Sequence, residues 1–175
     1  MKTQVAIVGS GPAGLMLGHL LRQAGIDAII VERQSREHVE GRIRAGVLED
    51  TTTHILDRLG INARMRAEGL PHGGVNLADG ERLIRIDIAA LTGRPVMVYG
   101  QTEVTRDLID AAPARGLQIV WRAESVRLHD IETDAPYLTF HSDGKPQRID
   151  ALHRRLRRLP RAVEADDSAG RHPGI

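Results

Sequence analysis

The chain has 175 residues, of which 41% are hydrophobic, so it is long enough to bury the core of one domain. Its formal net charge of +1 argues against nucleic acid as the main ligand. It contains no cysteine, and its eight histidines form no His-x3-His pair, so neither a disulfide nor a metal site is expected. No run approaches the roughly eighteen apolar residues of a membrane span, and no signal peptide precedes the first apolar run. We therefore expect a cytoplasmic protein with no membrane partner.

The first thirty residues have the pattern strand, glycine-rich turn, helix and strand. Residues 4–8 (QVAIV) are apolar and are predicted to form a buried strand, and the turn GSGPAG follows at residues 9–14. Pro12 lies where the first turn of a helix tolerates proline, and Gly25 is expected to end that helix. Its apolar positions recur at helical spacing: Leu15, Leu17, Leu20 and Leu21. Residues 27–32 (DAIIVE) are predicted as a second strand that ends in an acid.

Each part of this pattern has a physical role in binding a dinucleotide. Gly9 permits a tight turn, Gly11 lets the backbone approach a pyrophosphate, and Gly14 lets helix and strand pack closely. The helix N-terminus offers N–H groups and a partial positive charge to that pyrophosphate. Glu32 can accept hydrogen bonds from ribose hydroxyls. The alternative is a plain tight turn in a βαβ unit, but that alternative does not account for the acid.

The next segments mix a polar loop with short elements. Residues 33–46 are charged and are predicted to form a long functional loop, followed by a helix over 48–59 that ends at Gly60. Two strands at 73–77 and 83–88 are predicted to form a hairpin through Asp79-Gly80. Alternating residues of the second strand are expected to face inward: Ile84, Ile86 and Ile88.

The second half of the chain continues this mixture. Residues 96–99 are predicted as a strand, and Thr102 is expected to cap a helix with a buried stripe of Val104, Leu108 and Ile109. Further strands are predicted at 117–121, 125–129, 137–141 and 147–150, the last three as an antiparallel meander. The fold class is therefore α/β, with parallel βαβ units and a later antiparallel meander.

Two further segments are more specific than the glycine turn: GRIRAGVLE at residues 41–49 and YGQTEVTRDL at 99–108. Together with residues 9–14 they closely resemble the FAD-dependent aromatic hydroxylases, in particular those that convert 4-hydroxybenzoate to 3,4-dihydroxybenzoate with NADPH and O2. The resemblance covers roughly residues 1–150. It implies a Rossmann-like FAD-binding domain with a parallel sheet and an antiparallel meander, truncated relative to the family. It also implies a phenolic acid as substrate and is compatible with a homodimer.

The resemblance implies which positions contact FAD and NADPH. The backbone of residues 11–14 would hold the FAD pyrophosphate, Glu32 the adenosine ribose and Gln101 the flavin side of the cofactor. Arg42 and Arg44 would contact FAD phosphates in a loop that also takes part in NADPH binding. The implied cofactor-binding residues are Gly9, Gly11, Ala13, Gly14, Glu32, Arg33, Arg42, Ile43, Arg44, Ala45, Gly46, Val47 and Gln101. No catalytic residue is assigned, because the family's substrate-binding residues lie in its second half.

The coenzyme specificity stays open at this point. Arg33, Gln34 and His38 match a segment associated with NADPH recognition, but NADPH-specific members often carry tyrosine where this chain has His38. Arginine forks pair bidentately with phosphate oxygens, so the arginine loop suits a pyrophosphate without reference to the family. The alternatives are that Arg42 and Arg44 are solvated surface charges, that Gln101 only caps a helix, and that His38 is merely exposed.

Residues 151–175 depart from the pattern, with five arginines between positions 153 and 161. We expect a disordered tail, since a basic amphipathic helix for RNA or a membrane surface would lack aromatic anchors. From Ala151 onward, permitted codons also encode RYIAGCDGFHGQSRQTIP in a neighbouring frame, and this reading contains the Gly-Cys-Asp-Gly motif of the family. We hypothesise a frameshift near codon 151. The chain would then be an inactive N-terminal portion of a hydroxylase; the alternatives are a stand-alone FAD- or NAD-binding module and a non-functional gene remnant.

Overall fold

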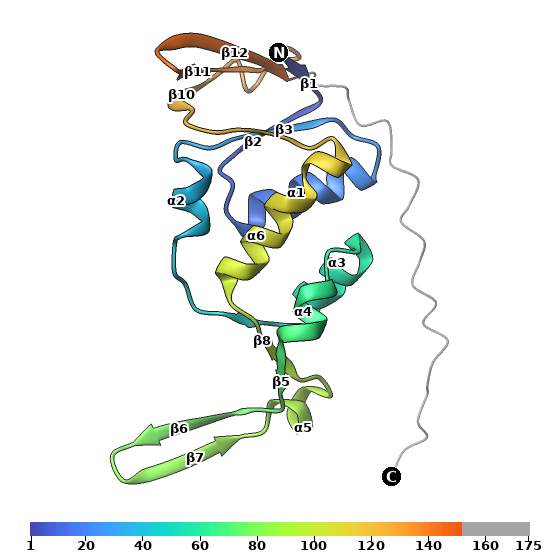
Figure 1. Cartoon of the computed structure of the whole chain (residues 1–175), viewed down its shortest axis with the longest axis vertical. Coiled ribbons are helices and arrows are strands. Elements are labelled where there is room, and N and C mark those ends of the chain that lie inside the picture. The colour runs from blue at the N-terminus through green and yellow to red at the C-terminus, as the bar shows by residue number, and fades with distance from the viewer. Residues whose placement is uncertain (152–175) are drawn as a thin grey trace.

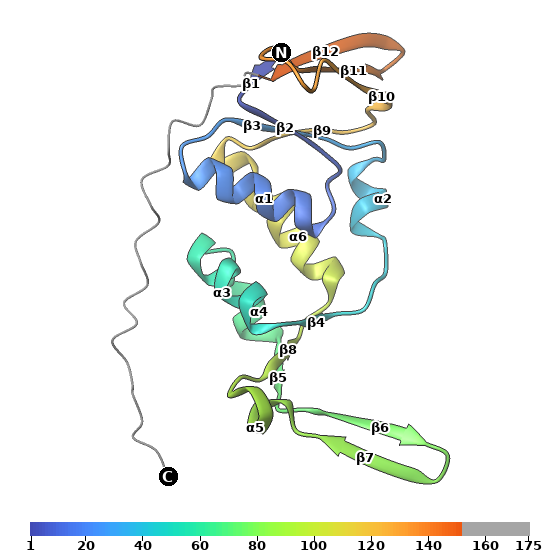
Figure 2. The same cartoon turned by 180° about the vertical axis from the view of Figure 1, so that it is seen from behind.

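A computed structural model describes residues 1–151 of the chain, and the basic tail predicted from residue 151 lies outside this part except for Ala151 itself. Two sheets and two helices form successive layers at one end of the molecule (Figures 1 and 2). The inner sheet is parallel and has the order β2-β3-β9, with Val5 opposite Ala28 and Ile29 opposite Gln118. Its strands are β2 (Val5–Val8), β3 (Ala28–Val31) and β9 (Gln118–Val120).

The outer sheet is the predicted meander, with the order β1-β12-β11-β10. Its strands are β1 (Lys2–Thr3), β10 (Glu124–His129), β11 (Tyr137–Ser142) and β12 (Lys145–Ala151). Strands β10 to β12 are antiparallel, whereas β1 pairs in parallel with β12 through Thr3 and Ala151. The N-terminal strand thus begins in the outer sheet and continues into the inner one.

Strand β3 is buried on both faces and joins two clusters of the core. Ile29 and Val31 face the meander, where they pack with Leu138, Phe140 and Ile149. Ala28 and Ile30 face the cluster that holds Leu15, Leu108 and Leu117. This double burial explains the continuous apolar run of the strand. Two helices of this second cluster lie under the inner sheet: α1 (Pro12–Gln23) and α6 (Gln101–Ala111), which is followed by a short 3-10 helix, η1 (Pro113–Arg115).

The segment between β3 and α6 forms the rest of the molecule. It contains α2 (Arg36–Glu40), β4 (Val47–Leu48), α3 (Asp50–Leu59), α4 (Ala63–Glu68), β5 (Leu70–His72), β6 (Val75–Asp79), β7 (Arg82–Ile86), α5 (Ile88–Thr92) and β8 (Val96–Val98). Strands β4, β8 and β5 form a small antiparallel sheet, and β6 and β7 form the predicted hairpin, which extends away from the body (Figure 1).

Most predicted elements are confirmed, but helix α2 interrupts the loop predicted over residues 33–46, and further details differ as follows. The cap of α6 is Gly100, and Thr102 lies inside the helix. The helix predicted from residue 48 begins at Asp50, because Val47–Leu48 pairs with β8 instead. Strand β7 ends at Ile86, and Ile88 opens α5. Ile84 is 51% exposed whereas Ile86 and Ile88 are half-buried, so the expected inward face of the hairpin is only partly covered. Leu17 is also exposed, since α1 packs on the sheet through Leu15, Gly18 and His19.

Candidate cofactor site

The three glycines of the turn differ in their backbone geometry and surroundings. Gly9 has a φ of 104°, which L side chains rarely adopt. A Cβ atom at Gly14 would lie 2.1 Å from the carbonyl oxygen of Gly9, so helix α1 approaches the turn as closely as backbone allows. A Cβ atom at Gly11 would meet nothing within 4 Å, so this glycine instead leaves open space beside the backbone. The turn at Gly9 and the close packing at Gly14 are as predicted from the sequence, whereas the approach of a pyrophosphate at Gly11 stays a prediction.

The N-terminus of α1 opens onto that space. Gly11 is the N-cap, no side chain caps the helix, and its first turn carries no acidic residue. The first hydrogen bond of the helix runs from the N–H of Leu15 to the carbonyl of Gly11 at 3.0 Å. The N–H groups of Ala13 and Gly14 therefore have no intrahelical acceptor, and helix geometry directs them along the axis toward an anion.

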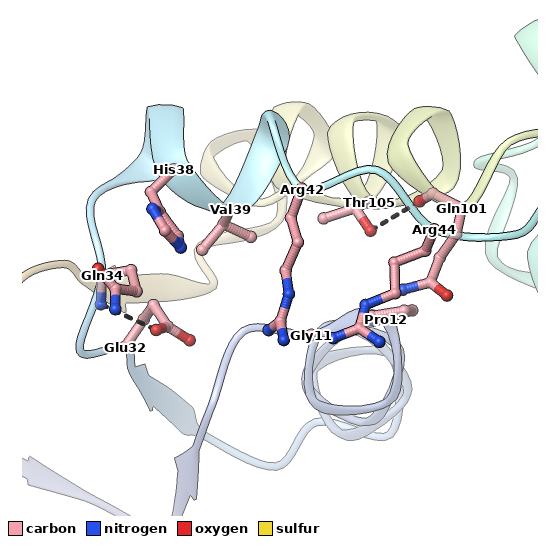
Figure 3. A pocket seen from close by; sticks show the side chains of 10 residues that line it. All are labelled: Gly11, Pro12, Glu32, Gln34, His38, Val39, Arg42, Arg44, Gln101 and Thr105. Atoms are coloured by element: carbon pink, nitrogen blue, oxygen red, sulfur yellow. Dashed lines mark hydrogen bonds between the residues drawn. The ribbon is translucent and has the colours of Figure 1, made fainter.

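A cavity of about 290 Å³ lies over this helix end, and four other segments contribute to it (Figure 3). They are the end of β3, helix α2, the loop of residues 41–46 and the first turn of α6; we call residues 41–46 the arginine loop. The side chains that line the cavity from these segments are Glu32, Gln34, His38, Val39, Arg42, Arg44, Gln101 and Thr105. The glycine turn thus meets the two other motifs of the sequence in one place.

Arg42 and Arg44 make the cavity strongly attractive to anions. Both side chains extend from the arginine loop toward Gly11 and Pro12, and the side chain of Gln101 lies beside that of Arg44 (Figure 3). Among residues 1–151, neither guanidinium has a carboxylate within 4.0 Å. Two guanidinium groups with no carboxylate partner in this part of the chain, facing an uncapped helix N-terminus, are an arrangement typical of phosphate or pyrophosphate binding.

Glu32 stays ionised at the edge of this cavity. One carboxylate oxygen accepts hydrogen bonds from the N–H and the hydroxyl of Ser10, at 2.8 and 3.1 Å, and the other accepts from the N–H of Gln34 at 2.9 Å. Partial burial acts to raise the pKa of Glu32, but these hydrogen bonds outweigh it and lower the pKa below its usual value. A carboxylate has about four acceptor positions, so an acceptor remains for a hydroxyl group of a ligand.

Glu32 also lines a second cavity of about 410 Å³ at the carboxyl ends of β2 and β3. This cavity is formed with Gly9, Arg33 and residues 123–126, where the chain enters β10. Ser125 has a φ of 53° beside an irregularity in the pairing of β10 with β11, and it lies at the wall of the cavity. The acid therefore separates a cationic chamber over α1 from a more neutral chamber beside the sheet.

The predicted site residues fall into three groups. The first cavity contains Gly11, Glu32, Arg42, Arg44 and Gln101, and the second contains Gly9, Glu32 and Arg33. The predicted residues that line neither cavity are Ala13, Gly14, Ile43, Ala45, Gly46 and Val47. Ile43 is 91% exposed between the two arginines, whereas Gly46 packs against Gly100, so the loop presents its arginines to the cavity and its aliphatic side chains elsewhere.

The structure also adds residues that the sequence did not identify. Helix α2 brings Val39 into the cavity, and Thr105 lies one turn into α6, its hydroxyl donating to the carbonyl of Gln101 at 2.8 Å. Ser35, whose hydroxyl accepts from the N–H of His38 at 3.3 Å, was the available signal for the start of α2. His38 is exposed and lines the cavity, and Gln101 is the first residue of α6 and not its cap.

The described part shows neither a metal-binding cluster nor a helix suited to span a membrane. Residues 1–151 hold no group of three or more histidine, aspartate or glutamate side chains placed to bind a metal ion. None of the helices in this part has the length and apolar character to cross a membrane.

The fold and the site define an α/β dinucleotide-binding domain, with two arginines over the N-terminus of α1 and an acid at the end of β3. Comparison with known families identifies which dinucleotide-binding family the chain belongs to. A family model described as "FAD binding domain" matches residues 2–153. The chain belongs to this family, whose cofactor is FAD, and its relatives are flavin-dependent aromatic monooxygenases.

Among curated proteins, the p-hydroxybenzoate hydroxylase of Acinetobacter baylyi is 46% identical over 151 residues. The match covers 86% of this chain but only 37% of that protein, so the chain spans little more than a third of its length. The para-nitrophenol 4-monooxygenase of a Pseudomonas strain is 28% identical over 156 residues, with 84% of this chain and 38% of the relative covered.

A solved structure confirms the fold. The OxyS anhydrotetracycline hydroxylase of Streptomyces rimosus superimposes with a TM-score of 0.73 at 23% identity. The superposition covers 87% of this chain and 30% of that one, and at this identity it supports the architecture alone.

Proposed function

We propose that this chain forms the adenosine-diphosphate-binding portion of the FAD site in an aromatic monooxygenase that hydroxylates 4-hydroxybenzoate with NADPH and O2. The observation that carries the cofactor part is the pair of unpaired arginines over the uncapped N-terminus of α1. The 46% identity to the Acinetobacter p-hydroxybenzoate hydroxylase supports the aromatic substrate. The same identity and the arginine loop support NADPH as the source of electrons.

The residues present fit the ADP moiety of FAD. Arg42 and Arg44 would pair with the pyrophosphate oxygens, which would also accept hydrogen bonds from the first N–H groups of α1. The open side of Gly11 gives those oxygens room against the backbone. Glu32 would accept from ribose hydroxyls at the junction of the two cavities, which leaves the second cavity for adenine. The side chain of Gln101 would lie toward the flavin end.

The bound flavin supplies the redox chemistry by which one oxygen atom of O2 enters the aromatic ring. The chain's own residues bind and orient the cofactor. Among residues 1–151, we assign no side chain that lines either cavity a role as acid or base toward a phenol. We therefore propose that the 175-residue chain alone has no hydroxylase activity. Addition of 4-hydroxybenzoate to the purified chain with FAD and NADPH is expected to leave NADPH oxidation unchanged, and substrate-stimulated turnover would contradict this.

The cofactor site is tested by binding. Isothermal titration with ADP and FAD would compare the wild type with the Arg42→Ala/Arg44→Ala variant. Loss of two charge-assisted contacts is expected to weaken ADP binding by about a hundredfold. Arg82→Ala/Arg85→Ala is the matched control, since it removes the same charge from the exposed hairpin. Equal ADP affinity in all three proteins would refute the proposed pyrophosphate site.

A stand-alone NAD-binding module is the second candidate, because a strand-end acid after a glycine-rich turn also binds the ribose of NAD. Titration with NAD⁺ in the same experiment separates the two. Tighter binding of FAD than of NAD⁺, together with a yellow purified protein, is expected for the flavin site. A colourless protein that binds NAD⁺ more tightly would favour the NAD module.

A further inference from the structure

Tyr99 joins three segments around the cofactor cavity without lining it. The residue is buried between β8 and α6, and its backbone N–H donates to the carbonyl of Gly46 at 2.9 Å. Its phenol donates to one carboxylate oxygen of Asp107, in the second turn of α6, at 2.7 Å. The other oxygen of Asp107 accepts from Arg64 of α4 at 2.6 Å. Through its backbone N–H and its phenol, Tyr99 thus connects the arginine loop with α6 and, by way of Asp107, with α4.

The phenol of Tyr99 is a permanent donor in this position. Burial raises the pKa of Tyr99 far above its usual value, and the hydrogen bond to the Asp107 carboxylate raises it further. Asp107 is itself held by Arg64, whose second nitrogen also pairs with Glu103 of α6. The acceptor of the Tyr99 hydroxyl is therefore fixed in place by an ion-pair network between two helices.

The arginine loop is attached to α6 at both of its ends. A Cβ atom at Gly46 would lie 2.4 Å from the Cα atom of Gly100, so the loop touches the cap of α6 backbone to backbone. At the other end, the hydroxyl of Thr102 donates to the carbonyl of Arg42 at 3.4 Å. Because Arg42 and Arg44 lie between these attachments, the position of α6 sets where the guanidinium groups lie over α1.

We propose that Tyr99 is a positioning residue for the cofactor pyrophosphate, which fixes the arginine loop over the N-terminus of α1 through its bonds to Gly46 and Asp107. This inference rests on the proposed function. Tyr99 lines neither cavity, so it acts through the loop and not by contact with a ligand.

The test compares Tyr99→Phe with Tyr137→Phe in the full 175-residue chain, whose only two tyrosines are these. Tyr137 lies in β11 of the meander, and its hydroxyl makes no hydrogen bond within residues 1–151, so it is the matched control. Tyr99→Phe is expected to weaken ADP binding by about three- to tenfold, the usual effect of losing one hydrogen bond. Adenosine, which has no phosphate, should bind all three proteins equally.

A double-mutant cycle separates positioning from general stability. In the Arg42→Ala/Arg44→Ala background, Tyr99→Phe is expected to have no further effect on ADP affinity, because the groups it positions are absent. Wild-type ADP affinity in Tyr99→Phe, equal weakening of ADP and adenosine, or an undiminished effect without the arginines would each overturn the inference. If the arginine variant itself binds ADP like the wild type, the proposed function fails instead. Should Tyr99→Phe not fold, Asp107→Asn, which replaces the charged acceptor of the Tyr99 hydroxyl by a weaker neutral one, has the same expected outcomes.

Discussion

Two glycines of the turn are predicted to respond to alanine in opposite ways. In Gly14→Ala the new methyl group would lie 2.1 Å from the carbonyl oxygen of Gly9 and 3.4 Å from a side-chain carbon of Ile7. In Gly11→Ala it would meet nothing within 4 Å, and the φ of −67° at this position suits alanine. The first substitution should therefore damage the fold, and the second only the site.

The magnitudes follow from the same contacts. Alanine in place of glycine favours a helix by about 1 kcal/mol, but overpacking costs about 1–3 kcal/mol when side chains can adjust. The carbonyl of Gly9 belongs to the backbone of a tight turn, so the cost at Gly14 should exceed this range. A net loss of about 2 kcal/mol lowers the melting temperature of a chain this long by roughly 4–8 °C.

At Gly11 two small effects cancel. Alanine reduces the entropy of the unfolded chain, which stabilises by about 0.4–1 kcal/mol, but it is a poorer N-cap than glycine by a similar amount. The unfolding free energy should therefore change by less than about 0.5 kcal/mol. The methyl group would, however, occupy the space proposed for the pyrophosphate, and we expect ADP binding at least about tenfold weaker, or 1.4 kcal/mol.

Urea unfolding and ADP titration of the two variants measure both effects. Gly11→Ala with wild-type ADP affinity would show that the open space is not used by the ligand. Gly14→Ala with wild-type stability would show that the backbone of the turn can move away from helix α1 at little cost. Either result would refute the corresponding step of the reasoning.

Three further predictions concern the core, the loop and the tail. His19 is fully buried, its Nε2 lies 2.8 Å from the carbonyl of Leu108, and its Nδ1 has no partner. Burial lowers the pKa of His19 below its ordinary 6.5, nearby Arg115 lowers it further, and the carbonyl only partly opposes this. As the pH falls, His19 is therefore protonated in the unfolded chain before it is protonated in the folded one. The stability that the neutral, buried His19 contributes is complete above about pH 6.5 and is lost as the pH falls through the lowered pKa. In urea unfolding between pH 8 and 5, the unfolding free energy of the wild type should therefore decrease as the pH falls. The decrease should be smaller in His19→Gln, whose side chain keeps a donor but does not titrate, and equal decreases would contradict this prediction. Gly46→Ala should weaken ADP binding more than Gly73→Ala, because a Cβ atom would lie 2.4 Å from the backbone at Gly46 and 3.7 Å from Ala89 at Gly73; equal ADP affinities would argue against the tight attachment of the loop. Finally, DNA sequenced across codon 151 is expected to encode Gly-Cys-Asp-Gly in a neighbouring frame, and its absence there would refute the proposed frameshift.

The strand–turn–helix–strand unit was predictable because local rules decide it. Glycine and proline positions fixed the turn and both ends of α1, and the continuous apolar run of β3 reflects burial on both faces. Helix α2 was missed because five residues are too short to show a helical period. The alternation of β7 was visible, but periodicity only shows that one face is apolar; it does not show what covers that face.

The site was predictable only in part. Spacing alone placed Gly11 and Glu32 together, because both belong to one βαβ unit. The convergence of Arg42, Arg44 and Gln101 came from the family resemblance, since it depends on how the arginine loop packs on α6. Thr102 looked like a cap by residue type, but the contact between Gly46 and Gly100 places the start of the helix two residues earlier. Such backbone-to-backbone contacts leave no period or motif in the sequence.

The arrangement around α6 changes which residues should control cofactor affinity. Arg36 of α2 pairs with Asp110, Arg64 of α4 pairs with Asp107, and the arginine loop touches Gly100, so three separate segments are fixed to one helix. Single exposed ion pairs contribute little to stability, but these pairs act together on the position of a loop that carries two unpaired arginines. A shift of α6 would move both guanidinium groups relative to α1 while leaving the glycine turn intact. We therefore expect cofactor affinity to depend on residues outside the glycine motif, and substitutions on the α4 side of α6 should change ADP binding before they change the turn.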